Sequence, residues 1–295
     1  MKTLDQLIGN TPLVRFQHIP VVNPRVQVYG KLEGNNPGGS VKDRAAYGMI
    51  SGALERGTIE PGDHLVEATS GNTGIALAMI AQIKGVNMTL LMPESATKER
   101  IQTMKAYGAT VILTPAEKTI EYSRQEAERM AREEGYHMLN QFANPDNYGM
   151  HYRTTGPEIW QGTEGKITHF VSSMGTTGTI MGVSRYLKEQ NPDIQIIGVQ
   201  PTDGSRIPGI RRWSPEFLPA IYEPHRVDRI IDVSRQEAID MARRLAKEEG
   251  ILAGMSSGGA LTAACKLGSE ISAGLIVSIV CDRGDRYLSS NLFEG

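Results

Sequence analysis

A lysine at the start of a predicted helix is the first residue of this sequence that invites a chemical role. The stretch KLEGNNPGGSVKDR (31–44) runs from an extended segment through a loop rich in Gly, Asn and Pro into a helix expected from Val41. Lys42 then lies in the first helical turn, where the positive end of the helix dipole disfavours a cation. A plain helix start, with Ser40 as N-cap and Asp43 in the first turn, explains the same residues. The spacing alone leaves both interpretations open.

A second loop, SSMGTTGT (172–179), has the composition of a site for one phosphate group. Gly175 and Gly178 allow backbone N–H groups to converge, threonine hydroxyls add donors, and a following helix N-terminus favours an anion. The loop has neither GK[ST] nor GxGxxG, which disfavours a triphosphate and a dinucleotide. A phosphate monoester fits this loop best, and an ordinary Gly/Thr turn is the alternative.

Two more polar loops are predicted between a strand and a helix. EATSGNTG (67–74) offers small donors without a competing charge, which suits a carboxylate, although a Ser/Thr-rich capping turn has the same composition. GMSSGG (254–259) matches the GxSxG nucleophile elbow of α/β-hydrolases. That elbow requires a histidine later in the chain, and no histidine follows Ser256, because the last one is His225. The hydrolase interpretation therefore fails.

Together, these loops contain the parts that pyridoxal phosphate requires: an amine for its aldehyde, a phosphate site and a contact for its ring nitrogen. NPGGSVKDR, EATSGNTG, SSMGTTGT and GMSSGG, in this order, resemble the fold-type II family of pyridoxal-phosphate-dependent β-replacement enzymes. The pattern is most similar to the cysteine synthases (O-acetylserine sulfhydrylases), and IPGIRRW (207–213) and CDRGDRYLS (281–289) resemble their B branch. IGNTPLV (8–14) fits as well, so the resemblance covers nearly the whole chain.

The resemblance implies pyridoxal 5′-phosphate as the cofactor, held covalently by Lys42. It implies that Asn72 bonds the 3′-oxygen of the ring and that Ser256 meets the pyridine nitrogen. A serine leaves that nitrogen largely neutral, which favours a substrate with a good leaving group. The implied contacts of the cofactor phosphate are Gly175, Thr176, Thr177, Gly178 and Thr179. The implied contacts of the substrate carboxylate are Thr69, Ser70, Gly71, Thr73 and Gln141.

The implied reaction is a ping-pong β-replacement on O-acetyl-L-serine through an aminoacrylate intermediate. Sulfide or thiosulfate would replace acetate and give L-cysteine or S-sulfo-L-cysteine, with Lys42 as the general base at Cα. Arg211 and Arg212 would accept the anionic second substrate, with surface solvation as the alternative. Cys281 is either a second-substrate contact or a small core residue. A serine/threonine dehydratase, a cystathionine β-synthase-like enzyme and a non-catalytic, peptide-binding member of the fold stay open as alternatives.

Composition excludes several other classes. The 295 residues carry 31 Lys+Arg against 33 Asp+Glu, and no basic tract indicates nucleic acid or a membrane surface. The start of the sequence is too polar for a signal peptide, and no apolar run is long enough to span a bilayer. The two cysteines and six histidines lack the spacing of a metal site. We therefore expect a cytoplasmic protein without a metal that acts on small molecules, and the resemblance implies a homodimer.

Extended segments and helices alternate along most of the chain, which predicts an α/β fold with buried parallel sheets. Strands are predicted at 26–32, 64–68, 86–93, 109–114, 167–173, 194–201 and 275–281, and helices at 42–56, 71–84, 97–107, 116–134, 179–190, 234–249 and 257–271. The resemblance implies two open, mostly parallel sheets covered by helices, as in tryptophan synthase β. A smaller domain (1–11 and 36–146) would carry Lys42 and the carboxylate loop, and a larger one (12–35 and 147–295) the phosphate loop. NPDNY (144–148) is the expected hinge.

Overall fold

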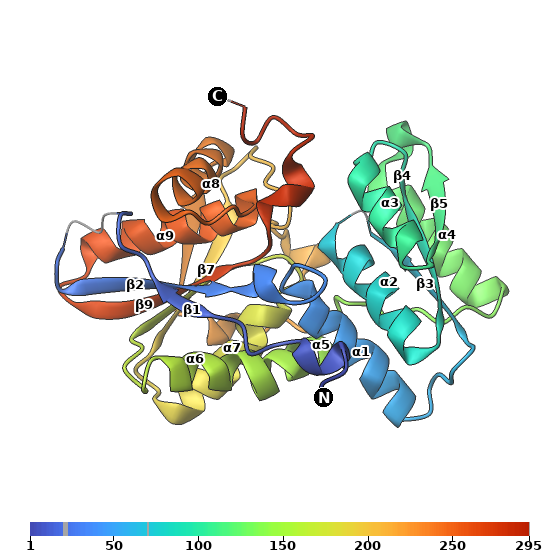
Figure 1. Cartoon of the computed structure of the whole chain (residues 1–295), viewed down its shortest axis with the longest axis horizontal. Coiled ribbons are helices and arrows are strands. Elements are labelled where there is room, and N and C mark those ends of the chain that lie inside the picture. Colours follow the sequence, from blue (N-terminus) through green and yellow to red (C-terminus); the bar gives the residue numbers. More distant parts are fainter. Residues whose placement is uncertain (20–22, 70, 295) are drawn as a thin grey trace. The chain divides into compact units, whose positions relative to one another are not determined.

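The computed structural model describes residues 1–19, 23–69 and 71–294 of the chain (Figure 1). These residues form two compact units, each with its own sheet. Unit 1 is made of Met1–Ile8 and Lys42–Asn147, and unit 2 of Gly9–Val41 and Tyr148–Gly295. Ser70, which the resemblance implies as a substrate contact, lies outside the described residues.

Unit 1 is a three-stranded parallel sheet with helices on both faces. Its elements are α1 (Lys42–Glu55), β3 (His64–Ala68), α2 (Asn72–Lys84), β4 (Asn87–Pro93), α3 (Lys98–Ala106), β5 (Thr110–Thr114), η3 (Ala116–Lys118) and α4 (Thr119–Glu133). Side chains alternate along β4, so that Leu90 joins the core shared with α1 and α2, and Leu91 packs with Ala127 and Met130 of α4. Because both faces are covered, the central strand is an almost unbroken apolar run.

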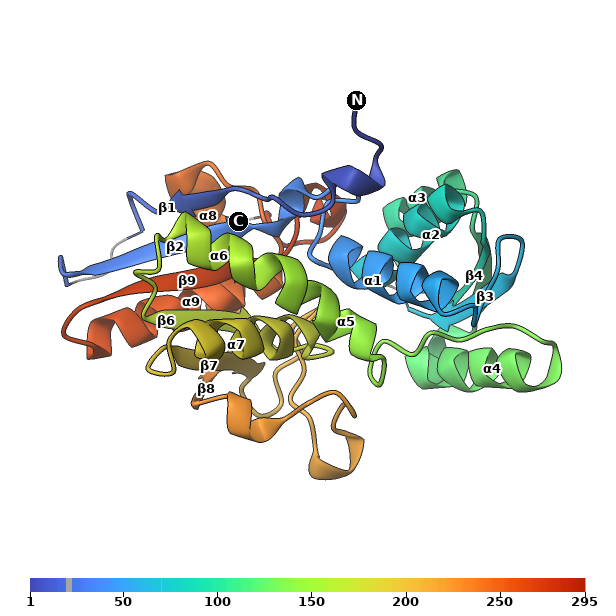
Figure 2. The same ribbon diagram turned by 90° about the horizontal axis from the view of Figure 1, so that it is seen from below.

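Unit 2 is a six-stranded sheet in the order β1-β2-β9-β6-β7-β8, in which only the β1–β2 pair is antiparallel. Its strands are β1 (Leu13–Arg15), β2 (Val26–Leu32), β6 (His169–Ser173), β7 (Gln195–Pro201), β8 (Arg229–Val233) and β9 (Gly274–Val280). The helices of this part of the chain are α5 (Pro145–Met150), α6 (Gly156–Gly162), α7 (Gly178–Gln190), α8 (Arg235–Glu249) and α9 (Met255–Glu270). One face of the sheet packs on α8 and α9 and the other on α6 and α7 (Figure 2).

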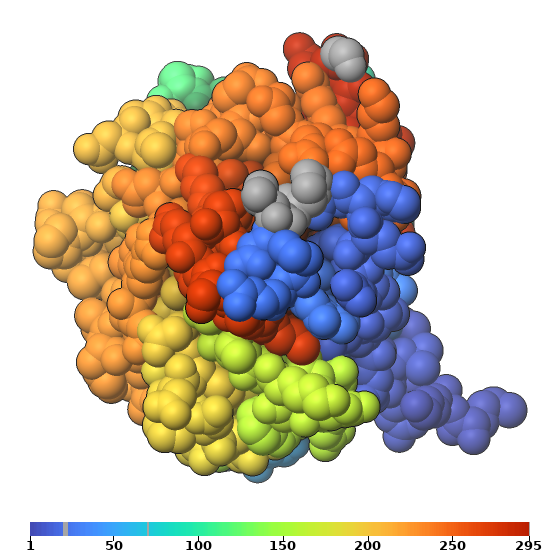
Figure 3. All heavy atoms as spheres, turned by 90° about the vertical axis from the view of Figure 1, so that its left-hand side faces the viewer, coloured from blue at the N-terminus to red at the C-terminus, as the bar shows by residue number. Residues whose placement is uncertain are grey.

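The end of the β2–β9 pair is closed by hydrogen bonds between segments distant in the sequence. Gly274 donates its backbone N–H to the carbonyl of Arg25 (3.1 Å), and the Asn23 amide donates to the carbonyl of Ile271 (3.0 Å). Figure 3 shows these segments, blue and red, side by side on the face that it presents. No helix in the described residues is long and apolar enough to cross a membrane.

The predicted fold class, two mostly parallel sheets covered by helices, is confirmed, and every predicted strand is present within two residues of its expected ends. The sequence prediction missed two strands, β1 and β8. It also missed α5, the π-helical turn η4 (His151–Thr155) and α6, since 144–148 had been expected as a hinge and α5 begins there at Pro145. β8 was not predicted because it is a half-exposed strand at the edge of the sheet, and its apolar run is too short.

Two predicted boundaries are wrong. The helix expected at 116–134 is broken near its start, because Thr119, the first residue of α4 directly after η3, has a φ of 59°. GMSSGG does not link a strand to a helix: α9 already begins at Met255, and the residues before it follow α8, with only an isolated bridge between Ala253 and Arg283. Residues 255–259 are thus the first turns of a helix.

Candidate active site

Lys42 is the first residue of α1, as the sequence predicts. The residue before it, Val41, donates its backbone N–H to the carbonyl of Cys281 (2.8 Å), directly after β9. Ser40 forms an isolated antiparallel bridge with Asp282. The segment that leads to Lys42 is therefore tied to the end of a central strand of unit 2, and its last residues have defined backbone positions.

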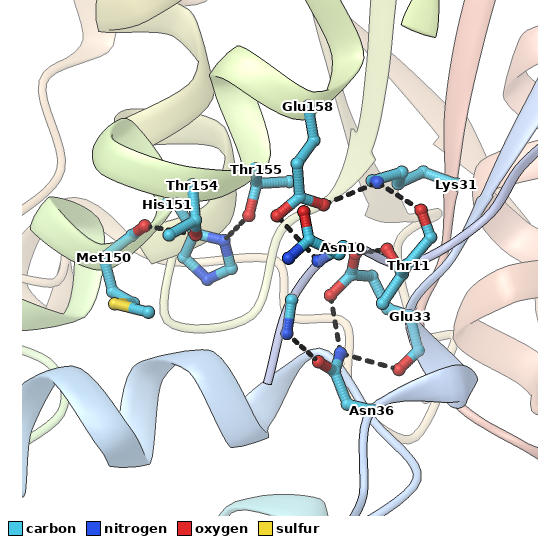
Figure 4. A network of polar contacts seen from close by, with 11 residues as sticks. Asn10, Thr11, Lys31, Glu33, Asn36, Met150, His151, Thr154, Thr155 and Glu158 are labelled. Atoms are coloured by element: carbon cyan, nitrogen blue, oxygen red, sulfur yellow. Dashed lines mark hydrogen bonds and ion pairs between the residues drawn. The ribbon is translucent and has the colours of Figure 1, made fainter. Parts of the chain in front are cut away.

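A buried polar network supports the same segment (Figure 4). The ammonium group of Lys31, only 2% exposed, pairs with Glu158 (2.6 Å) and donates to the carbonyl of Thr11 (2.6 Å). Glu33 is fully buried and accepts hydrogen bonds from the hydroxyl of Thr11 (2.7 Å) and the amide of Asn36 (2.9 Å). Such groups are stable in the interior only when they are paired. The network joins the end of β2 to residues 9–11 and α6, and it makes Asn36 a structural residue.

In unit 1, the predicted carboxylate loop lies between β3 and α2, and it contacts a segment almost 70 residues away. Thr73, in the first turn of α2, donates its hydroxyl to Oε1 of Gln141 (3.0 Å). The backbone carbonyl of Gln141 accepts from the amide of Asn147 (2.8 Å). Because Oε1 of Gln141 accepts from Thr73, its NH₂ group is the part available to a ligand, and this group suits a carboxylate. The structure thus brings the predicted residues of unit 1 together: Thr69, Gly71, Asn72, Thr73 and Gln141.

Glu67, at the start of this loop, is a residue for which the sequence predicts no role. Its side chain is 6% exposed and accepts the backbone N–H of Asn140 (3.3 Å), the neighbour of Gln141. Burial raises the pKa of the Glu67 carboxyl to about 7, and the Asn140 hydrogen bond and the charge of Arg124 oppose the shift only in part. When this buried carboxyl is ionised, it destabilises the folded protein relative to the unfolded chain.

Glu67→Gln is therefore expected to stabilise the protein in a pH-dependent way. The folded protein binds the Glu67 proton more tightly than the unfolded chain, so that stability is lost as pH rises from the usual pKa near 4.5 through about 7. The expected gain in the free energy of unfolding from Glu67→Gln is about 3 kcal/mol at pH 8 and less than about 1 kcal/mol at pH 5. Urea unfolding of both proteins, followed by circular dichroism at the two pH values, measures it. The exposed Glu117→Gln is the control, and an equal gain at both pH values would contradict the prediction.

The predicted phosphate loop connects β6 to α7 in unit 2. Thr177 precedes α7 in the left-handed conformation, with a φ of 71°. The Thr177 hydroxyl is buried and has no hydrogen-bond partner in the protein. At Gly175, a Cβ atom would come within 2.7 Å of the carbonyl oxygen of Gly209, so only glycine fits there. The loop is closely packed and still keeps an unused donor.

The segment IPGIRRW (207–213) lies against the phosphate loop. The indole of Trp213 donates to the carbonyl of Gly175 (2.9 Å), and the backbone N–H of Arg211 donates to the carbonyl of Met174 (2.8 Å). The Arg211 guanidinium is exposed and lies 5.5 Å from the centre of the Trp213 ring. Arg212 is engaged elsewhere: it pairs with Asp232 and Asp203 and donates to the carbonyl of Pro201. Of the two predicted anion contacts, the geometry favours Arg211.

Ser256 is held at the start of α9, where it is 5% exposed. Its carbonyl accepts the hydroxyl of Ser173 (2.8 Å) at the end of β6, next to the phosphate loop. Asp282 accepts the backbone N–H of Gly254 (3.1 Å) and the hydroxyl of Tyr287 (2.5 Å), which anchors the beginning of the helix. The motif CDRGDRYLS is thus a support for Ser256 through the carboxylate of Asp282.

The two cysteines have different environments. Cys281 is half-buried directly after β9, and its backbone N–H donates to the hydroxyl of Ser257 (2.9 Å). Cys265 packs against the core that α8 and α9 share, and burial raises the pKa of its thiol to about 11. A thiol with this pKa is unreactive at neutral pH. Cys265 is a core residue. Cys281 directly follows β9, and its carbonyl accepts the backbone N–H of Val41.

The donors in both units suit pyridoxal phosphate. The buried, unpartnered hydroxyl of Thr177 and the N-terminus of α7 suit a phosphate dianion. Ser256 offers an uncharged hydroxyl at a helix start, and Thr73 orients an amide NH₂ for a carboxylate. His151, for which the sequence predicts no role either, lies with its Nε2 3.3 Å from the hydroxyl of Thr179. No motif surrounds His151, so nothing in the sequence separates it from an ordinary core histidine.

Comparison with known proteins shows the family of this chain. Residues 4–282 match the family model described as "Pyridoxal-phosphate dependent enzyme", and the chain belongs to this family of enzymes. Cysteine synthase B of Pseudomonas aeruginosa is 59% identical over 292 residues, which cover 99% of this chain and 97% of that protein. Cysteine synthase B of Escherichia coli (strain K12) is 55% identical, with 99% and 96% covered.

Solved structures show the same similarity. The cysteine synthase (OASS) of Entamoeba histolytica matches with a TM-score of 0.94 at 38% identity, covering 100% of this chain and 91% of that chain. An O-ureido-L-serine synthase matches with a TM-score of 0.93 at 34% identity, covering 100% and 96%. The fold class and the dependence on pyridoxal phosphate predicted from the sequence are thereby confirmed.

Proposed function

We propose that this protein makes L-cysteine from O-acetyl-L-serine and sulfide, with acetate as the second product. The observation that carries the proposal is the identity of 59% to a cysteine synthase B across 99% of the chain. The geometry supports it, because each unit holds one part of the required donor set. The O-ureido-L-serine synthase with a similar fold is only 34% identical to this chain, so it gives weaker support for a function than cysteine synthase B does.

The proposed binding roles follow the predicted residues. Gly175–Thr179 hold the cofactor phosphate, with the Thr177 hydroxyl donating to it, and Asn72 bonds the 3′-oxygen of the ring. Thr69, Gly71, Thr73 and the NH₂ group of Gln141 bind the substrate carboxylate, and we keep Ser70 as a predicted contact. Ser256 meets the ring nitrogen as a neutral partner. When bound, pyridoxal phosphate supplies the electron-withdrawing ring that makes the substrate Cα–H acidic and allows acetate to leave Cβ.

The proposed proton transfers are made by Lys42. Its Nζ would hold the cofactor, and as a free amine it would take the proton from the substrate Cα while the Cβ–O bond to acetate breaks. Sulfide would then form a bond to Cβ, Nζ would return its proton to Cα, and cysteine would be released. The protons balance, since O-acetylserine and hydrogen sulfide give cysteine and acetic acid. The uncharged Ser256 fits a reaction in which deprotonation and loss of a good leaving group go together.

The experiment that tests this function is a nucleophile panel. Purified protein with pyridoxal phosphate and O-acetyl-L-serine is given sulfide, thiosulfate, homocysteine or no nucleophile, and products are identified by mass spectrometry. Cysteine formed with sulfide, at a rate well above pyruvate release without a nucleophile, supports the proposal. Pyruvate as the main product would indicate a dehydratase, and preferred use of homocysteine a cystathionine β-synthase-like enzyme. A protein that neither binds pyridoxal phosphate nor turns over would contradict the proposal.

Use of thiosulfate as a second nucleophile is a further part of the proposal, and Arg211 is the residue expected to bind this anion. The guanidinium is exposed, its backbone is fixed to the phosphate loop, and its planar fork suits an oxyanion. Arg211→Ala is expected to lower kcat/KM for thiosulfate about 10-fold and that for sulfide less than about 2-fold. Cys281 is retained as a proposed second-substrate contact.

Steady-state rates with both nucleophiles measure the effect of Arg211→Ala. Arg211→Lys keeps the positive charge without the planar guanidinium. Its kcat/KM for thiosulfate should lie between the values of the unsubstituted protein and Arg211→Ala. Arg212→Ala serves as the neighbouring comparison, because the carboxylates of Asp232 and Asp203 already engage that guanidinium. Equal losses of kcat/KM with sulfide and thiosulfate in Arg211→Ala would contradict a role of Arg211 in binding the thiosulfate anion.

Other predictions from the sequence are retained as parts of this proposal. They are a smaller domain formed by 1–11 and 36–146, a larger one formed by 12–35 and 147–295, a cytoplasmic location and a homodimer.

A further inference from the structure

His151 is a buried, polar residue outside all the predicted motifs. Its side chain is 1% exposed, and it is the first residue of η4, a π-helical turn between α5 and α6. Turns of this kind are rare and often mark functional sites. Figure 4 shows the imidazole directed at Thr155, which lies one turn further along and is fully buried.

The imidazole connects Thr155 to the phosphate loop. Its Nδ1 lies 2.8 Å from the hydroxyl oxygen of Thr155, and its Nε2 lies 3.3 Å from the hydroxyl oxygen of Thr179. Thr179 is the last residue of the predicted phosphate loop and lies in the first turn of α7, where it is partly exposed. The buried histidine therefore contacts a threonine of the predicted phosphate loop that is itself only partly buried.

Close packing of two helical segments builds this contact. At Gly182, three residues after Thr179, a Cβ atom would collide with the carbonyl oxygen of Tyr148 and lie 2.6 Å from the Cβ of His151. The absence of a side chain at Gly182 lets the backbone around His151 lie directly against α7. The position of the imidazole against Thr179 is thus a consequence of how the chain packs.

Hydrogen-bond chemistry sets the direction of the chain of contacts. A threonine hydroxyl has one proton, so Thr179 can donate it to a phosphate oxygen only if its neighbour Nε2 donates to it. A neutral imidazole has one donor and one acceptor, and Nε2–H therefore requires Nδ1 to accept from the hydroxyl of Thr155.

We propose that Thr155, His151 and Thr179 form a hydrogen-bond relay that turns the Thr179 hydroxyl into a fixed donor to the cofactor phosphate. The relay runs from Thr155 O–H to Nδ1, from Nε2–H to Thr179, and from Thr179 O–H to the phosphate. His151 is then a positioning residue, and the proposal rests on the proposed role of Thr179. The competing interpretation is a core histidine whose hydrogen bonds are satisfied without any effect on the cofactor.

The test compares binding of pyridoxal 5′-phosphate with binding of pyridoxal, which lacks the phosphate, to protein stripped of cofactor. His151→Leu is expected to raise the Kd of pyridoxal phosphate about fivefold and to leave the Kd of pyridoxal unchanged. His151→Gln, which keeps an N–H donor, should recover much of the affinity. The ³¹P chemical shift of the bound cofactor should change in His151→Leu in the same direction as in Thr179→Val. His225→Leu removes an exposed histidine of unit 2 and is the matched control.

Several outcomes would overturn the relay. They are equal loss of affinity for both ligands in His151→Leu, no change in either, or an Nδ1–H tautomer of His151 in ¹⁵N spectra of the holoenzyme. If His151→Leu does not fold, Thr155→Val must still alter the tautomer and the ³¹P shift, and unchanged spectra would contradict the proposal. If Thr179→Val changes neither the affinity for pyridoxal phosphate nor the ³¹P shift, the proposed role of Thr179 itself is wrong. If Thr179→Val changes them and His151→Leu does not, only the relay is overturned.

Discussion

Lys42→Ala is expected to lower kcat for cysteine formation by about 10³-fold or more, while the protein stays folded. In the proposed reaction Lys42 both holds the cofactor and carries the Cα proton away and back, so its removal takes away two functions at one atom. The side chain begins α1, and the backbone on either side of it is fixed by Val41 and by the helix. Loss of the amine should therefore act on the chemistry rather than on the fold.

Steady-state kinetics, visible absorption and circular dichroism measure this prediction together. Lys98→Ala is the matched control, because Lys98 is also the first residue of a helix in unit 1, α3, and is exposed. Borohydride reduction followed by peptide mapping should find pyridoxyl-lysine at Lys42 in the unsubstituted protein and not in Lys42→Ala. A variant that keeps more than about a tenth of the activity would exclude Lys42 as the proton carrier.

Gln141→Ala is expected to raise KM for O-acetyl-L-serine by about 10- to 100-fold with a smaller change in kcat. A hydrogen bond to a charged group contributes about 1.5–3 kcal/mol, and a carboxylate held equally in the ground state and the transition state affects mainly KM. The contact between Thr73 and Gln141 at 3.0 Å fixes which end of the amide faces the ligand. Gln141→Glu should be worse than Gln141→Ala, since it places a negative charge next to the substrate carboxylate.

The same kinetics should separate substrate binding from second-substrate chemistry. KM for sulfide should stay within about twofold in Gln141→Ala, since no charge or hydrogen bond proposed for that step is altered. Gln125→Ala, on the exposed side of α4, is the same substitution without the contact to Thr73. A fall in kcat with an unchanged KM for O-acetylserine would show that Gln141 does not hold the carboxylate in the ground state.

Local sequence signals predicted the elements that carry the proposed site. Continuous apolar runs such as 86–93 marked the buried strands, because a strand covered on both faces exposes no polar side to water. The Gly-, Ser- and Thr-rich loops at 67–74 and 172–179 lie between a strand and a helix, as predicted. Lys42 is at the first position of its helix, and the helix predicted at 234–249 begins with a capping box formed by Ser234 and Glu237. Each of these features depends on residues only a few positions apart.

Features that depend on partners distant in the sequence escaped prediction. The raised pKa of Glu67 comes from burial and from Asn140, 73 positions away. Arg212 looked equivalent to Arg211 in the sequence, and only the fold shows that Asp232 and Asp203 engage it. His151 and the short helices around it carry no motif, and the contact with Thr179 exists because α7 lacks a side chain at Gly182.

By itself, the sequence determined the order of most strands and helices, the family and the kind of chemistry, because apolar periodicity and linked motifs depend on short stretches of chain. Only the tertiary structure decided how individual side chains serve that chemistry. It aimed the Gln141 amide through Thr73, left the Thr177 hydroxyl unpartnered and set His151 behind Thr179. The physical reason is that burial and hydrogen-bond direction depend on which atoms become neighbours, and neighbours are settled by packing across the whole unit.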